Sequence, residues 1–246
     1  MGSLIICMAG LNTRFHDVGF DMPKYLLPWR GSCIIHSIIN EFQTRHKFTN
    51  IILLANKRDL YFRKSLVDAI KHIGLDETNI HYIGDTNGQA HTAYIGSTIA
   101  KSNEPIFVHN ADTHLTFRNF NHIIEMLKTA DAFVDVFVAN NPKYSYVKKE
   151  GDRVIEIVEK NPISPFASSG LYCFKTAELY QEYFNKLQKD FTKSEMYIAD
   201  VLALMLNDRK LIVTNELNNR EETIVLGSPQ EYGLEIAKWS IVGRQN

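Results

Sequence analysis

Short apolar runs alternate with amphipathic stretches through the first half of the chain. The runs predict strands over residues 3–9, 51–55, 79–83 and 105–109. The stretches between and after them predict helices over 32–46, 58–73 and 89–101, the first with isoleucines at helical spacing. Strand and helix in this alternation predict right-handed crossovers and a parallel sheet with helices on both faces.

After residue 131 the strands become more frequent. They are expected over 132–139, 145–148, 153–159, 169–174, 211–215 and 223–226, with helices over 177–188, 195–206 and 229–239. No stretch rich in Gly, Ser or Pro separates the two halves. We therefore expect one α/β domain spanning 1–246, with a Rossmann-like, mixed but mostly parallel sheet covered by helices on both faces.

Charge and composition restrict the partners. The 246 residues carry 27 Lys and Arg against 28 Asp and Glu, a net charge of -1, so no overall field attracts nucleic acid or a membrane. The apolar runs are far shorter than the roughly 20 residues of a membrane span, and no signal peptide is recognisable. The 3 cysteines form neither a disulfide framework nor a metal motif. A cytoplasmic protein is expected, with homo-oligomerisation left open.

Polar residues that follow the predicted strands are the first candidates for function, because open parallel sheets bind ligands beyond the carboxyl ends of their strands. The first strand leads into Ala9, Gly10, Leu11 and Asn12. Backbone N–H groups of such a small-residue loop can face a phosphate. The cations Arg14 and Lys24 follow it, and a solvated loop is the alternative interpretation.

The segments AGLNTRF at 9–15 and MPKYLLPWRG at 22–31 resemble the signature of the sugar nucleotidyltransferases. These enzymes transfer a nucleoside monophosphate from an NTP to a phosphorylated sugar and release pyrophosphate. The resemblance implies that the loop wraps the triphosphate and that Arg14 and Lys24 contact its phosphates. Asn12 replaces the usual second glycine, a mild departure because Asn tolerates left-handed backbone conformations.

Later segments follow the order of the same family. Gly88 and Gln89 resemble the loop that contacts the base and ribose, although Gln89 also suits an ordinary first helical turn. Asn110, Ala111 and Asp112 resemble the segment that ends the fourth strand, which makes Asp112 the expected Mg²⁺ ligand, with a helix cap as the alternative. His114 is a weaker candidate for a base or a neighbour of the metal.

The resemblance also implies an acceptor site. Glu159 and Lys160 match the segment that contacts the acceptor, and Ser169 and Gly170 begin the strand after it. Lys193 stands where the family has a phosphate-binding arginine, so its contact would be less bidentate, and a solvated lysine is the alternative.

One departure concerns the metal. The segment from Leu226 to Pro229 resembles the family's DxGTP motif, but the position of its metal-binding aspartate is Val225, which cannot ligate Mg²⁺. Either the nearby Glu222 substitutes or the metal is held by Asp112, phosphates and water.

The resemblance implies an NTP-binding half at 1–130 and an acceptor-binding half at 131–246 in the same sheet. No general base is required, because a phosphate monoester is largely dianionic near neutral pH. A pyrimidine NTP and a sugar 1-phosphate for surface-polysaccharide precursors are favoured. A cytidylyltransferase for phosphoglutamine or phosphocholine, a GT-A glycosyltransferase and a non-catalytic nucleotide-binding subunit are the alternatives.

Overall fold

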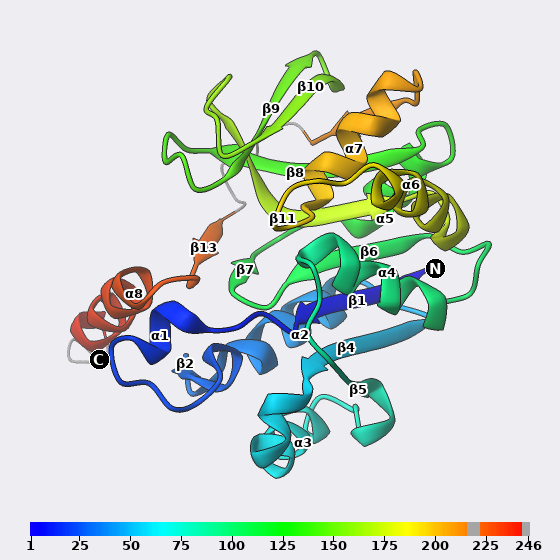
Figure 1. The fold of residues 1–246 in the computed structure, drawn as a ribbon. Helices are drawn as coiled ribbons and strands as arrows, with labels where there is room; N and C mark the ends of the chain where they lie inside the picture. The colour runs from blue at the N-terminus through cyan, green and yellow to red at the C-terminus, as the bar shows by residue number, and fades with distance from the viewer. Residues whose placement is uncertain (216–221, 243–246) are drawn as a thin grey trace.

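The computed structural model describes residues 1–215 and 222–242. Its central element is a nine-stranded sheet in the order β5-β4-β1-β6-β11-β8-β12-β10-β9 (Figure 1). The strands are β1 (Ser3–Met8), β4 (Asn50–Asn56), β5 (Ile80–Ile83), β6 (Ile106–Asn110), β8 (Ala132–Val138), β9 (Ser145–Glu150), β10 (Arg153–Glu159), β11 (Phe166–Phe174) and β12 (Ile212–Thr214). Strands from both halves of the chain share this sheet, so the predicted mixed α/β domain is confirmed.

The expectation of a mostly parallel sheet holds only for the first half. Parallel pairings join β5, β4, β1 and β6, and later β8 with β12. The pairings of β11 with β6 and β8, and of β10 with β9 and β12, are antiparallel. The turn at Gly151, with φ 61°, is too short for the crossover that a parallel pair needs. A further pairing of Ala167 with Tyr146 closes β11, β8, β12, β10 and β9 into a ring.

Helices cover both faces of the sheet. The helices are α1 (Thr13–His16), α2 (Ile34–Arg45), α3 (Arg63–Lys71), α4 (Gln89–Ile99), α5 (Phe120–Leu127), α6 (Ala177–Lys189), α7 (Ile198–Asn207) and α8 (Pro229–Val242). Side chains of α2, α3 and α5 join one hydrophobic cluster, and those of α4, α6 and α7 join the other. In β1, Leu4 and Ile6 belong to the first cluster and Ile5 to the second, as the alternation of side chains along a strand requires.

Short elements complete the fold, and the sequence predicted one of them as a strand, over 223–226. They are the 3-10 helices η1 (Lys24–Leu26), η2 (Lys57–Phe62) and η3 (Glu77–Asn79), and the strand pairs β2 (Pro28–Trp29) with β3 (Ser32–Cys33) and β7 (Thr113–Leu115) with β13 (Thr223–Val225). The β7–β13 pair brings the C-terminal segment back beside the end of β6 (Figure 1). Among the described residues, no helix has the length and apolar character that crossing a bilayer requires.

A buried ion pair fixes β7 and β13 to the main sheet. The side chains of Arg118 and Asp135 are 3% and 1% exposed, and Arg118 Nε and Nη2 donate to the Asp135 carboxylate at 3.0–3.1 Å. Arg118 also donates to the Thr223 hydroxyl at 2.8 Å and to the carbonyls of Thr116 and Glu222. One guanidinium therefore joins β8 to both strands of the smaller pair.

Replacing Asp135 by Asn is expected to lower the free energy of unfolding by about 3–5 kcal/mol, because it leaves a buried guanidinium without its counter-charge. Urea denaturation followed by circular dichroism measures the loss. Asp68→Asn, which breaks an exposed pair with Lys71, is the control and should change stability far less. Equal effects of the two substitutions would contradict the structural role of Arg118 and Asp135.

Candidate active site

Two adjoining cavities lie at the carboxyl ends of β1 and β6. The loop cavity, about 560 Å³, is lined by Ala9, Gly10, Leu11, Lys24, Asp85, Thr86, Gly88, Gln89, Asn110, Ala111, Asp112, Ser194 and Glu195, among others. The inner cavity, about 290 Å³, is lined by Arg14, Gln89, Asn110, Asp112, Lys143, Tyr144, Ser145, Glu159, Lys160, Ser168, Ser169, Gly170, Glu195, Tyr197, Val225 and Glu231, among others. Gln89, Asn110 and Asp112 separate the two cavities and face both.

The loop after β1 adopts the backbone turn that the sequence suggested. Asn12 is left-handed, with φ 58° and ψ 19°, and its side-chain amide donates to the Met22 carbonyl at 3.3 Å. This bond ties the loop to the segment that carries Lys24. The loop residues Ala9, Gly10 and Leu11 line the loop cavity, whereas Asn12 contributes the turn itself.

Asp112 is the acidic centre of the site. Its carboxylate follows β6 and forms an ion pair with the Lys24 ammonium. Burial would raise the pKa of Asp112, but Lys24, His109 and Arg14 outweigh it and hold that pKa below its ordinary value. Asp112 is therefore a fixed anion beside two cations, an arrangement suited to oxygen ligation of a divalent ion and to binding phosphates.

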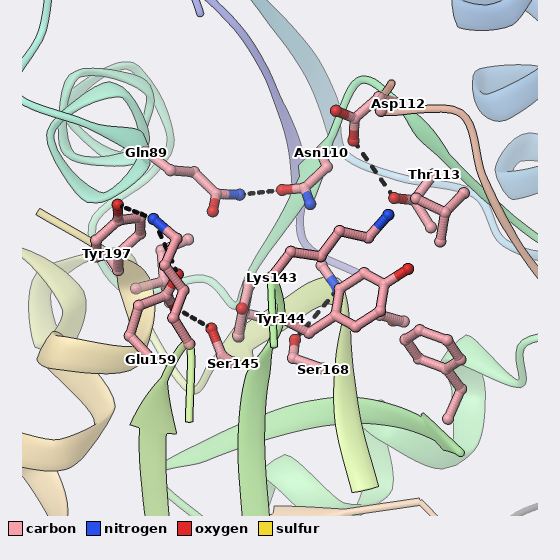
Figure 2. Close-up of a pocket in the computed structure, with 18 of the residues that line it drawn as sticks. Gln89, Asn110, Asp112, Thr113, Lys143, Tyr144, Ser145, Glu159, Ser168 and Tyr197 are labelled. Carbon is pink, nitrogen blue, oxygen red and sulfur yellow. Dashed lines mark hydrogen bonds and ion pairs between the residues drawn. The ribbon is translucent and has the colours of Figure 1, made fainter. Parts of the chain in front are cut away.

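Gln89 and Asn110 form the wall between the cavities. The Gln89 amide, at the start of α4, donates to the Asn110 side-chain oxygen at the end of β6 (Figure 2). Gly170, with φ 89°, leaves room for the Asn110 side chain, because a Cβ at position 170 would lie 2.2 Å from Asn110 Nδ2. Gly88 has φ 105°, and a Cβ there would lie 2.5 Å from the Met196 carbonyl oxygen. Glycine at 88 is therefore required by the backbone at Met196, which packs against it.

The far end of the inner cavity carries the predicted acceptor residues Glu159 and Lys160. Ser145 donates to Glu159, and the Lys160 ammonium bonds the Tyr197 hydroxyl and lies 4.4 Å from that ring (Figure 2). Burial raises the pKa of Glu159, although Ser145 and Lys160 favour its charged form. This end therefore offers paired donors and acceptors, with Ser169 and Gly170 beside them.

Three residues that the sequence offered as site candidates either lie outside the two cavities or have a structural role. The Lys193 ammonium pairs with Asp200 at 2.6 Å, and Lys193 lines a separate shallow cavity rather than either part of the site. The buried His114 packs edge-on against Trp29, and burial lowers its pKa to about 4, so it is a neutral structural residue. Glu222 pairs through its backbone with Thr116, three positions along from Val225.

Val225 does lie beside Asp112, as the motif register predicts. Both line the inner cavity, and the Leu226 amide donates to the Asp112 carbonyl at 2.7 Å. No group of three His, Cys, Asp or Glu side chains that could hold a metal gathers within 1–215 and 222–242. Mg²⁺ commonly binds through one or two carboxylates together with substrate phosphates and water. Asp112, whose Oδ2 already binds a cationic ammonium, fits that mode of binding.

The sequence missed Lys143 and Glu231, which meet across the inner cavity as an ion pair. Lys143 lies between β8 and β9, and Glu231 lies in the first turn of α8. Glu231 lies two positions after Pro229, which ends the segment that resembles the DxGTP motif, whereas Lys143 lies outside every segment that carries the resemblance. No local pattern indicates that two such distant residues meet.

Comparison with known proteins assigns the fold to a family. The chain matches the nucleotidyl transferase family over residues 3–245. The chain belongs to this family. A bifunctional protein GlmU from Nitratiruptor sp. is 30% identical over 215 residues, which is 82% of this chain and 46% of that protein. The GlmU of Carboxydothermus hydrogenoformans is 22% identical over 91% of this chain and 49% of that protein. The chain thus spans about half the length of these nucleotidyl transferase relatives.

Solved structures share the same architecture. A nucleoside-diphosphate-sugar pyrophosphorylase from Vibrio cholerae superposes with a TM-score of 0.82 at 26% identity, covering 95% of this chain and 99% of that one. A glucose-1-phosphate thymidylyltransferase described as putative, from Bacillus anthracis, has a TM-score of 0.77 at 18% identity, covering 96% and 93%. The inositol-1-phosphate CTP transferase of T. maritima has a TM-score of 0.71 at 15% identity, covering 94% and 91%. These likenesses extend the nucleotidyl transferase fold over the whole described sheet.

The raised pKa of Glu159 predicts a pH-dependent effect of Glu159→Gln. The folded state binds this proton more tightly than the unfolded state, so wild-type stability falls as pH rises above the ordinary glutamate pKa of about 4.3. Glutamine removes the cost of the buried charge, so the variant should melt about 2–4 °C above the wild type near pH 8, the shift that roughly 1 kcal/mol gives in a chain of this size. The gain should vanish near pH 4.

Thermal denaturation at both pH values measures this difference. Glu156→Gln, exposed on the same strand, is the matched control and should give no pH-dependent difference. A variant that melts below the wild type by the same amount at both pH values would show that burial does not dominate at Glu159.

Proposed function

We propose that the chain transfers a nucleoside monophosphate from an NTP to a phosphorylated small molecule and releases pyrophosphate. The observation that carries this proposal is the position of Asp112, Lys24 and Arg14 where the loop cavity meets the inner cavity. Family membership supports the same reaction. The nucleotide would occupy the loop cavity, in the half formed by 1–130, and the acceptor the inner cavity, largely formed by 131–246.

The reaction requires two polyanions to meet. An oxygen of the acceptor phosphate attacks the α-phosphorus, and the bond to the bridging oxygen breaks, so its electron pair leaves with pyrophosphate. A phosphate monoester is largely dianionic near neutral pH, so no proton has to be removed from it. Positioning and neutralisation of charge are what remain for the protein to supply.

Specific residues of the site can position the phosphates and neutralise their charge. Lys24 in the loop cavity and Arg14 in the inner cavity would bind the phosphates of the NTP from either side of Asp112, with backbone N–H groups of Gly10 and Leu11 in the loop cavity. Asp112 would hold Mg²⁺, which when bound neutralises charge on the α- and β-phosphates and on the leaving group. Gln89, at the wall, has a side-chain amide with both a donor and an acceptor for the nucleotide.

The finer features of this proposal come from the sequence. We favour a pyrimidine NTP, a sugar 1-phosphate acceptor, a cytoplasmic location and a role in making surface-polysaccharide precursors. The carboxylates of Glu159 and Glu195 at the far end of the inner cavity favour, as a second candidate, a cytidylyltransferase whose acceptor carries a hydroxyl or an ammonium, such as phosphocholine or phosphoglutamine.

Release of pyrophosphate tests the reaction. CTP, UTP, dTTP, GTP and ATP are each assayed with Mg²⁺ against glucose 1-phosphate, mannose 1-phosphate, phosphocholine and phosphoglutamine. Pyrophosphate formed with one pair identifies both substrates. Binding of an NTP without turnover of any acceptor would favour a binding subunit, and transfer of sugar from a sugar nucleotide would favour a GT-A glycosyltransferase.

Replacing Lys24 by Ala should cost about 2–4 kcal/mol in the transition state, the scale of losing one preorganised donor to a developing charge. The value of kcat/KM for the NTP, measured by pyrophosphate release, gives this loss. Lys71→Ala, which breaks an exposed pair on α3, is the matched control. An unchanged kcat/KM in Lys24→Ala would remove this residue from the catalytic site.

A further inference from the structure

The acceptor phosphate needs a cation close to Asp112. Its attacking oxygen must come within bonding distance of the α-phosphorus, and the proposed nucleotide site places that atom beside Asp112, Lys24 and Arg14. The cation that binds this phosphate must therefore lie in the inner cavity at its Asp112 end. Lys24 and Arg14 are already assigned to the NTP, whose own phosphates require them.

Neither predicted acceptor lysine lies at that end. Lys193 is held by Asp200 outside the site. Lys160 lies at the far end, where its ammonium bonds the Tyr197 hydroxyl and stands 3.9 Å from a Glu159 oxygen (Figure 2). A lysine in that position can reach the body of an acceptor, but it does not lie at the Asp112 end of the cavity, where the attacking phosphate must be.

Lys143 meets the requirement. Its side chain, 30% exposed, extends along the inner cavity toward Asp112 and Thr113 (Figure 2). Its ammonium pairs with Glu231, and a Cβ placed on Gly227 would lie 3.1 Å from Asp112 Oδ2 and 3.8 Å from Glu231 Oε2. The partner of Lys143 is therefore a near neighbour of the Asp112 carboxylate.

Glu231 is itself held in place. The Ser228 hydroxyl donates to Glu231 Oε2 at 2.7 Å, and the Glu231 amide donates back to Ser228 Oγ at 3.3 Å. Burial raises the pKa of the adjacent Tyr144, with Glu231 and Asp112 adding to the shift, so this phenol stays protonated beside both carboxylates. The start of α8 thus presents a fixed carboxylate that orients the Lys143 ammonium.

We propose that Lys143 is the catalytic lysine that binds the attacking phosphate of the acceptor, and that Glu231 is its positioning residue. This inference rests on the proposed function. The N–H groups of the Lys143 ammonium donate to non-attacking oxygens of the acceptor phosphate while the third oxygen forms the bond to the α-phosphorus. Because it recognises the phosphate and not the group attached to it, Lys143 should serve every acceptor alike.

Kinetics with charge-changing variants test the role. Lys143→Met keeps the length of the side chain but removes its charge, and should lower kcat/KM for the acceptor about 100-fold or more, the scale of losing one donor to a reacting oxyanion. The dissociation constant of the NTP should stay within about twofold, and Lys143→Arg should recover most of the lost activity. Lys149→Met is the matched control, since the Lys149 ammonium bonds the Asn215 carbonyl and lies 4.9 Å from the Phe166 ring. If Lys143→Met weakened only the binding of the NTP and left kcat/KM for the acceptor unchanged, Lys143 would not be the ligand of the acceptor phosphate.

Glu231→Gln separates positioning from structural support. Lys143 keeps its charge in this variant but loses its ionic partner, so kcat should fall about tenfold or more while KM for the acceptor stays unchanged or falls. Unchanged kcat, or a melting temperature lowered with both constants altered together, would contradict the positioning role.

A binding measurement tests the inference without turnover. Methyl phosphate is titrated calorimetrically into the wild type, Lys143→Met and Lys149→Met in the absence of nucleotide. Weaker binding to Lys143→Met alone supports Lys143 as a phosphate ligand, even if no NTP and acceptor pair yields pyrophosphate and the proposed function fails. Equal binding to all three proteins refutes the role of Lys143, whether or not the wild type transfers a nucleotide.

Discussion

The site depends on keeping one carboxylate, that of Asp112, charged among cations at the end of a buried strand. Burial opposes this charge, and Lys24 and Arg14 reverse the effect. The ion pair with Lys24 also joins η1 to the end of β6 across 88 positions of sequence. Both cavities border the Asp112 carboxylate, so the ion pair that holds η1 against β6 also fixes the place where the two cavities adjoin.

Two further constraints keep Asp112 accessible. Gly170 leaves room for the Asn110 side chain, and Gly227 leaves room beside the Asp112 carboxylate. The buried pair of Arg118 and Asp135 holds β7 and β13 against β8, and β13 delivers Gly227 to the site. The C-terminal helix therefore reaches the site through a pair of three-residue strands, and the Arg118 guanidinium links this pair to β8.

The sequence predicts the parts of the fold that local pattern controls. Apolar runs located β1, β4 and β6, and isoleucine spacing located α2, because burial on both sides of a sheet or one side of a helix leaves a period in the sequence. Asn12 likewise carries its own local signal for a left-handed turn. The three residues of β7 leave no such period, and the strand predicted over 223–226 gave no sign of its pairing with β7, because the two are more than a hundred residues apart. The antiparallel orientation of β10 and β11 depends on the lengths of the connections before them, and composition does not indicate these lengths.

The difference between local pattern and long-range contact also explains why the sequence indicated Lys193 and missed Lys143. Motif position indicated Lys193, but its ammonium pairs with Asp200 in the first turn of α7. Lys143 has no helical or strand period and lies in a connection, so its role depends on where α8 returns to the sheet. A family pattern records which positions contact substrate on average. It does not record that Asp200 pairs with Lys193 in this chain, or that the return of α8 brings Glu231 to Lys143.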